Sequence, residues 1–213
     1  MTTDLELKQQ LAEVTTELYH AGVITATGGN LSVRSVEREG VVWITPSQIF
    51  KGALKADQMV AINLDGKAIE PSLKPSVEAV YHSGIMRQRP EINSVVHSHA
   101  PRATIFGMCD MEMVPFSTEA IFLMDFAVIP FYLGGSKELQ AEVLKAFTTA
   151  NGAYLRNHGL ITIGKDLRKA ADATLMVEHT IGILLDYKTA GLTPSTLPEK
   201  TVAMLRRFSA AML

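Results

Sequence analysis

Cysteine is nearly absent from this sequence, since its 213 residues include only Cys109. A single cysteine excludes a disulfide framework within the chain and a zinc site made of several thiolates. Any metal site built by this chain must therefore use histidine and carboxylate ligands, and six histidines are available. A chain so poor in cysteine fits a reducing compartment, so we expect a cytoplasmic protein.

Long apolar runs and an excess of basic charge are also missing. No segment approaches the ~20 apolar residues needed to cross a bilayer, and residues 1–10 have no continuous apolar stretch typical of a signal peptide. Lysine and arginine number 20 against 22 aspartate and glutamate residues, which gives a formal net charge of −2. This balance disfavours binding to the phosphate backbone of a nucleic acid. We therefore expect neither a membrane nor a nucleic acid as a partner.

Apolar residues, by contrast, make up 47% of the chain, which is enough to build a sizeable core. Their spacing predicts helices and strands along the whole sequence. The expected helices cover residues 4–20, 75–89, 136–150, 166–191 and 198–207. The expected strands cover residues 31–34, 41–45, 59–64, 67–69, 94–99, 127–131, 154–155 and 160–164. No linker or repeat divides the chain, so we expect a single α/β domain over residues 1–213.

The first candidate metal ligands lie on the expected strand 94–99. His97 and His99 are two residues apart, so their side chains leave the same face with Cα atoms about 6.6 Å apart and can converge on one ion. Such a pair is not specific, because histidines in a half-buried strand can equally serve in hydrogen bonding. A third ligand is needed. His158 is the best candidate, because it lies in a turn where Gly159 leaves room beside the imidazole.

Glu78 is the candidate general base. It lies four residues before His82 on the expected helix 75–89, so the two side chains share one face near the N-terminal end of that helix. One interpretation is a surface ion pair. The other is a catalytic carboxylate, because apolar neighbours can raise the pKa of Glu78 toward neutrality. His82 is then a supporting residue or part of the core.

Small polar residues predict a site for an anion. Thr27, Gly28 and Asn30 lie in a loop whose backbone N–H groups, hydroxyl and amide suit a phosphate or a carboxylate. Ser47 and Ser76 can add hydroxyl groups, and we expect Ser76 at a helix N-terminus, where negative charge is stabilised. The loop matches neither a Walker loop nor a dinucleotide fingerprint, so neither an NTP nor NAD is expected.

Several ordered motifs together resemble the class II aldolase and adducin-head family. They are TGGNLSVR at 27–34, ITPS at 44–47, PSVE at 75–78, VVHSHA at 95–100 and NHGLI at 157–161. That family includes L-fuculose-phosphate aldolases, L-ribulose-5-phosphate 4-epimerases and related dehydratases and decarboxylases. The resemblance extends over most of the chain. It implies a three-layer α/β/α single domain with a mixed, largely antiparallel central sheet, and a homotetramer with active sites at the subunit interfaces.

The resemblance also implies a role for each candidate residue. The metal-binding histidines of the family match His97, His99 and His158, and the acid/base glutamate matches Glu78. The positions that hold a substrate phosphate match Thr27, Asn30, Ser47 and Ser76. Zn²⁺ is the expected metal, although Mn²⁺, Fe²⁺ and Co²⁺ also suit imidazole ligands.

The implied function is that of a metal-dependent lyase. A site with three histidine ligands leaves at least one position open for the substrate. The leading interpretation is an aldolase that cleaves a small ketose phosphate through a metal-stabilised enediolate, with Glu78 moving the proton on the carbon next to the carbonyl. A sugar-phosphate epimerase is an alternative. An adducin-like scaffold module without catalysis is another alternative. The presence of all three histidines and of Glu78 disfavours it.

A metal-dependent decarboxylase of a hydroxy or keto acid is the closest alternative, because the chain departs from the fuculose-phosphate pattern. Val77 and Gln48 occupy places where that pattern has a serine and a glycine. The tyrosine that donates a proton there should fall near Thr118 or Glu119, and neither is a tyrosine. The expected small-molecule partner is therefore a sugar phosphate or a keto acid.

Overall fold

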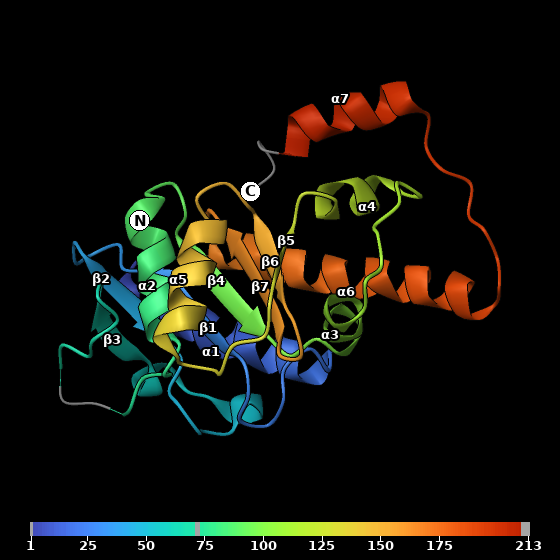
Figure 1. Ribbon diagram of the computed structural model, residues 1–213. Helices are drawn as coiled ribbons and strands as arrows, with labels where there is room; N and C mark the ends of the chain where they lie inside the picture. The colour runs from blue at the N-terminus through green and yellow to red at the C-terminus, as the bar shows by residue number, and fades with distance from the viewer. Residues whose placement is uncertain (1, 71–72, 210–213) are drawn as a thin grey trace.

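A seven-stranded sheet with the order β3-β2-β1-β4-β7-β6-β5 forms the centre of the molecule (Figure 1). Its strands are β1 Asn30–Arg34, β2 Val41–Ile44, β3 Val60–Asn63, β4 Ser94–Ser98, β5 Ala127–Ile129, β6 Gly152–Leu155 and β7 Gly159–Gly164. Neighbouring strands are antiparallel except β5 and β6, which are parallel. The computed structural model describes residues 2–70 and 73–209, and it confirms the mixed, largely antiparallel sheet.

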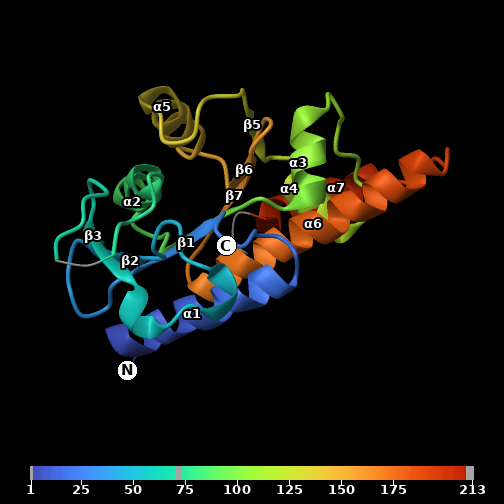
Figure 2. The ribbon, with the colours of Figure 1, turned by 90° about the horizontal axis from the view of Figure 1, so that it is seen from below.

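Helices cover both faces of this sheet. They are α1 Asp4–His20, α2 Ala79–Gln88, α3 Pro101–Met108, α4 Thr118–Leu123, α5 Lys137–Ala146, α6 Leu167–Thr189 and α7 Glu199–Ser209, with short 3₁₀ helices η1 Lys51–Ala53 and η2 Ala56–Gln58. Helices α2 and α5 lie on one face, and α1, α3 and α6 lie on the other (Figure 2). Helix α7 packs against α4. The expected three-layer α/β/α architecture is confirmed.

The sheet separates two apolar cores. Because successive residues of a strand point to opposite faces, β4 places Val95 in the core under α2 and α5 and Val96 in the core under α1 and α6. Among the described residues, no helix has both the length and the apolar character that a bilayer span requires. His97, the first of the candidate histidines along the chain, lies near the end of β4, between the two cores.

The helix expected from Pro75 begins later, at Ala79, so this prediction is wrong at its N-terminal end. Pro75 forms an antiparallel bridge with Pro46, which keeps it extended. Ser76 therefore lies in a turn before α2 and not at a helix N-terminus, and its Oγ accepts a hydrogen bond from the backbone N–H of Glu78 at 3.2 Å. The strand expected at 67–69 is reduced to one bridge between Ile62 and Ala68.

Helices α3 and α4 were not among the expected elements. Pro101 occupies the first turn of α3, where its missing N–H costs nothing. The next two N–H groups, of Arg102 and Ala103, donate to the carboxylate of Glu178 on α6 at 3.0 to 3.1 Å. This carboxylate caps α3 from a distant part of the chain, so the local sequence contains no sign of it. Helix α5, expected to reach residue 150, ends at Ala146.

Candidate functional site

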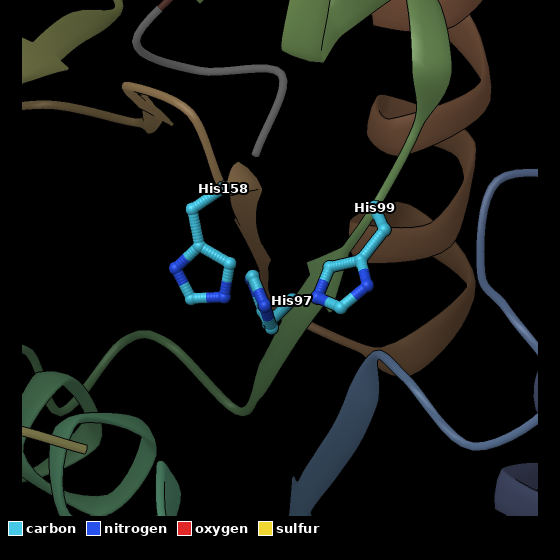
Figure 3. Close-up of side chains that lie close together, drawn as sticks. All are labelled: His97, His99 and His158. Atoms are coloured by element: carbon cyan, nitrogen blue, oxygen red, sulfur yellow. The ribbon is translucent and has the colours of Figure 1, made fainter. Parts of the chain in front are cut away.

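Three histidines gather where β4 ends beside the turn between β6 and β7 (Figure 3). His97 belongs to β4, His99 follows that strand, and His158 lies in the turn. Their ring centroids are 4.7 to 5.4 Å apart. One ring nitrogen from each lies within 4.8 Å of the others, an arrangement that could hold a metal ion. The structure thus brings together all three residues proposed as metal ligands.

The backbone around His158 explains its position. Asn157 has φ 57°, in the left-handed region that tightens the turn between β6 and β7. A Cβ on Gly159 would lie 2.2 Å from the carbonyl oxygen of Ser98, so glycine is required where β7 begins against the end of β4. This close approach holds His158 beside His97 of β4 and beside His99, which follows that strand.

The hydrogen bonding of His97 leaves one ring nitrogen available for a cation. Its side chain is fully buried, and Nδ1 lies 3.1 Å from the carbonyl oxygen of Leu160. Since a carbonyl can only accept, Nδ1–H donates and the lone pair remains on Nε2. Nε2 is buried and has no hydrogen-bond partner. Metal-binding histidines commonly use a carbonyl in this way, so the donor set fits a divalent ion, and binding one would satisfy the orphaned nitrogen.

Glu78 faces the same space from the start of α2. Its Oε2 lies 3.4 Å from His97 Nε2, and its Oε1 lies 3.6 Å from His158 Nε2. Asn30 Nδ2 donates a hydrogen bond to Oε2 at 2.8 Å, whereas Oε1 is buried and has no hydrogen-bond partner. Asn30 can do this because it pairs with His97 across β1 and β4, so the two side chains share one face of the sheet.

The expectation that the pKa of Glu78 is raised is wrong. Burial raises this pKa, but His97, the hydrogen bond from Asn30 and the other nearby imidazoles outweigh burial and lower it to about 2. The carboxylate has imidazoles and an amide as its neighbours, not the apolar side chains that surround it in the sequence. Burial lowers the pKa of His97 to about 4 and also lowers the pKa of His99. At neutral pH an ionised carboxylate therefore faces neutral His97 and His99, the forms that bind cations.

His82 is fully buried, and Glu78 is 6% exposed. The interpretation of these two residues as a surface ion pair is therefore wrong. The Nδ1 of His82 lies 2.8 Å from Ser32 Oγ, and its ring stacks on Tyr81 at a centroid distance of 5.1 Å. Burial lowers its pKa to about 3, so His82 is a neutral part of the interior beneath Glu78.

The loops expected to bind an anion adjoin one another. The loop containing Ser47 is held to that containing Ser76 by the bridge between Pro46 and Pro75 and by the Ser47 N–H, which donates to the carbonyl of Lys74 at 2.8 Å. Ser47 and Ser76 are half-buried, and Thr27 is exposed.

Gly28 brings the first of these loops against the histidines, since a Cβ on Gly28 would lie 2.7 Å from the His99 ring. Gly28 and His99 were both expected in the site, but nothing in the sequence indicated that they would be in contact.

Gln48 has φ 57°, a backbone conformation that favours glycine. The fuculose-phosphate pattern has a glycine at this place. Gln48 replaces that glycine, but its backbone keeps the conformation that a glycine would adopt. A non-glycine residue in this conformation costs roughly 1 kcal/mol. The other departure, Val77, is 61% exposed in the turn before α2.

Lys51 was not among the residues that the sequence predicted for the site. It begins η1, is buried, and donates a hydrogen bond from Nζ to the carbonyl oxygen of Pro46 at 2.5 Å. Its backbone N–H donates to the carbonyl of Ala26 at 2.8 Å, so Lys51 joins two of the loops described above. The available signal was a lysine directly after Ile49 and Phe50, but a lysine in such a context is usually exposed.

The chain is similar to known proteins over most of its length. The family model described as Class II Aldolase and Adducin N-terminal domain matches residues 9–185. The chain is 30% identical to the 3-oxo-tetronate 4-phosphate decarboxylase of Haemophilus influenzae, over 84% of this chain and 86% of that protein. It is 31% identical to the L-fuculose phosphate aldolase of Methanocaldococcus jannaschii, over 80% of this chain and 90% of that protein.

Solved structures share the fold. The YgbL protein of Klebsiella pneumoniae is similar with a TM-score of 0.89 at 24% identity, over 97% of this chain and all of that chain. A structure of L-fuculose 1-phosphate aldolase is similar with a TM-score of 0.82 at 25% identity, over 95% of each chain. Together with the match over residues 9–185, these findings show that the chain belongs to the class II aldolase and adducin N-terminal domain family and is an enzyme of that family.

Proposed function

We propose that the protein is a metal-dependent aldolase that cleaves a small ketose phosphate into two carbonyl fragments. The observation that supports this most is the position of Glu78, whose carboxylate lies within 3.6 Å of two of the three clustered histidines. A base beside a cation site is the arrangement that proton transfer next to a carbonyl requires. The similarity to a relative named L-fuculose phosphate aldolase supports the same reaction class.

His97, His99 and His158 would hold the metal, with Zn²⁺ favoured and Mn²⁺, Fe²⁺ or Co²⁺ as alternatives. When bound, a divalent ion supplies a Lewis acid for the negative charge that develops on a carbonyl oxygen. The neutral state of His97 and His99 at neutral pH supports this assignment, because protons then compete little with a metal ion.

Glu78 moves the proton on the carbon next to the carbonyl. Because its pKa is lowered, Glu78 is ionised at neutral pH and can remove this proton in the condensation direction. In the cleavage direction the substrate hydroxyl loses its proton as the carbon–carbon bond breaks to release the aldehyde, and Glu78 accepts a proton and delivers it to the carbon that has lost the aldehyde fragment. Asn30 holds one carboxylate oxygen, which leaves Oε1 free to face the substrate.

The substrate phosphate is held in this proposal by the adjoining loops, through Thr27, Gly28, Asn30, Ser47 and Ser76. The names of both relatives include a phosphorylated substrate, which supports an anion site. The hydrogen bond from Asn30 to Glu78 makes Asn30 a link between the anion loop and the base. We further propose one domain over residues 1–213 that assembles as a cytoplasmic homotetramer with active sites at the subunit interfaces.

Substitution of the base tests the proposal. Glu78→Gln keeps the size of the side chain but cannot accept the proton, so we expect cleavage of ketose phosphates to fall by about 100-fold or more. Metal content, measured by mass spectrometry of the purified protein, should stay at the wild-type level. Glu39→Gln, at an exposed glutamate, is the control and should leave both unchanged. Full aldolase activity in Glu78→Gln would overturn the assignment.

A decarboxylase of a phosphorylated keto acid is the second candidate. Its support is the 30% identity to a 3-oxo-tetronate 4-phosphate decarboxylase, together with Val77 and the missing tyrosine near Thr118. A screen of ketose phosphates and keto acids distinguishes the two reactions. Aldehyde formation supports the aldolase, whereas CO₂ release without an aldehyde supports the decarboxylase.

A further inference from the structure

Lys51 places a buried amine among the loops of the proposed anion site. The residue is 1% exposed, and its Nζ donates to the carbonyl oxygen of Pro46 at 2.5 Å. Pro46 directly precedes Ser47, and Ala26, whose carbonyl accepts the backbone N–H of Lys51, directly precedes Thr27. Lys51 therefore contacts the neighbours of two of the residues proposed to bind phosphate.

Among the residues that the structure describes, this amine has no counter-charge. Within residues 2–70 and 73–209, no carboxylate oxygen lies within 4.0 Å of Nζ. An ammonium group has three donors, and the carbonyl of Pro46 accepts one of them. A buried cation without an opposite charge is unfavourable. A bound anion would relieve this cost.

The amine is still charged under physiological conditions. Burial lowers the pKa of Lys51 to about 8, so the ammonium form predominates at pH 7. The whole chain has a formal net charge of −2 and therefore provides no general attraction for an anion. A positive charge at Lys51 would therefore supply a local attraction for an anion that the chain as a whole does not.

We propose that Lys51 is a specificity-determining residue of the anion site, whose positive charge selects substrates that contain a phosphate monoester. It acts from beneath the loops and also ties the loop at Ala26 to the loop at Pro46. This inference rests on the proposed function, because it concerns the part of the site that would receive the substrate phosphate. It adds a cationic residue to a site otherwise assigned to hydroxyl, amide and backbone groups.

Binding of inorganic phosphate tests the charge directly. Isothermal titration calorimetry would compare the wild type with Lys51→Gln and Lys51→Met. Glutamine retains a donor for the Pro46 carbonyl but no charge, and methionine retains neither. We expect the Kd for inorganic phosphate to rise about tenfold or more in both variants, as for loss of a charged hydrogen-bonding group. Lys55→Met, at an exposed lysine in the same segment, is the control and should bind like the wild type.

Steady-state kinetics would separate this role from a purely structural one. Lys51→Gln should raise KM for a ketose phosphate, with kcat and metal content close to those of the wild type. If Lys51→Met does not fold, Lys51→Gln alone decides the question. The proposal is overturned if Lys51→Gln binds inorganic phosphate as tightly as the wild type, or if the wild type does not bind it.

The phosphate measurement involves no turnover, so it is independent of the reaction proposed above. Full activity in Glu78→Gln would overturn the aldolase assignment and leave the result for Lys51 unchanged. Conversely, normal phosphate binding by Lys51→Gln, in an enzyme that cleaves ketose phosphates, would overturn only the inference about Lys51.

Discussion

Gly28 connects the anion loop with the histidine cluster. Its N–H donates to Thr25 Oγ1 at 2.9 Å, which holds the loop in a tight turn. A Cβ at this position would lie 2.7 Å from the His99 ring and 2.5 Å from Thr25 Oγ1. Any side chain on Gly28 must therefore displace His99 or the loop. The absence of a side chain is a condition for placing His99 beside His97 and His158.

Gly28→Ala should weaken metal binding for this reason. We expect the affinity for Zn²⁺ to fall by about tenfold or more, as when the supporting contacts of a metal ligand are changed. Competition with a chromophoric chelator measures it. Gly134→Ala is the matched control, because its Cβ would lie 3.8 Å from the His158 ring, an ordinary contact. Wild-type affinity in Gly28→Ala would argue against His99 as a ligand.

Individual residues of the site were largely predictable, but their environment was not. The spacing of His97 and His99 on one strand face, with His158 in a glycine turn, identified three side chains that the structure places together. The lowered pKa of Glu78 depends on His97 and on the hydrogen bond from Asn30, which is 48 residues away from Glu78 in the sequence. The buried state of Lys51 likewise depends on loops that only the fold brings together.

Helix α1 shows how one buried carboxylate joins two elements. Asp4, at the first position of α1, accepts hydrogen bonds from Ser35 Oγ at 2.6 Å and from the backbone N–H of Val36 at 2.9 Å. Both partners lie in the connection between β1 and β2. Burial raises the pKa of Asp4, but the hydrogen bonds outweigh burial and lower this pKa below its ordinary value. The ionised form of Asp4 therefore stabilises the folded protein.

Asp4→Ala should lower the free energy of unfolding by about 1–3 kcal/mol at pH 7, because it leaves buried donors without an acceptor. The folded pKa is below the unfolded value, so the pH-dependent stabilisation by Asp4 is present above about pH 4 and is lost as the pH falls through the lowered pKa. Urea unfolding at pH 7 and in acid measures both effects. Glu13→Ala, at an exposed position of α1, is the control. An equal difference from the wild type at both pH values would contradict this account.

Long elements with clear end signals were predicted well. Helices α1 and α6 are preceded by the N-cap residues Thr3 and Asp166, whose side chains accept hydrogen bonds from the first turn. Short elements were not predicted, because α3 and α4 have only eight and six residues and so provide little periodicity. The beginning of α2 was misplaced because the bridge between Pro46 and Pro75 joins segments far apart in the sequence.

At the scale of the whole molecule, the strand order could not be obtained from local patterns. Strand β1 pairs with β2, its neighbour in sequence, and also with β4, which follows more than fifty residues later. The parallel pair β5 and β6 requires helix α5 between its strands. The three-layer architecture was predicted from the resemblance to a family and not from local patterns. The pairing of β1 with β4 and of β4 with β7 then places Asn30, His97 and the His158 turn side by side.

We propose that His97, His99 and His158 together bind one divalent ion. X-ray absorption spectroscopy of the protein loaded with one equivalent of Zn²⁺ tests it most directly. We expect three imidazole nitrogen ligands at about 2.0–2.1 Å, no sulfur ligand, and one imidazole fewer in His158→Ala. A sulfur ligand, or a spectrum that His158→Ala leaves unchanged, would contradict it.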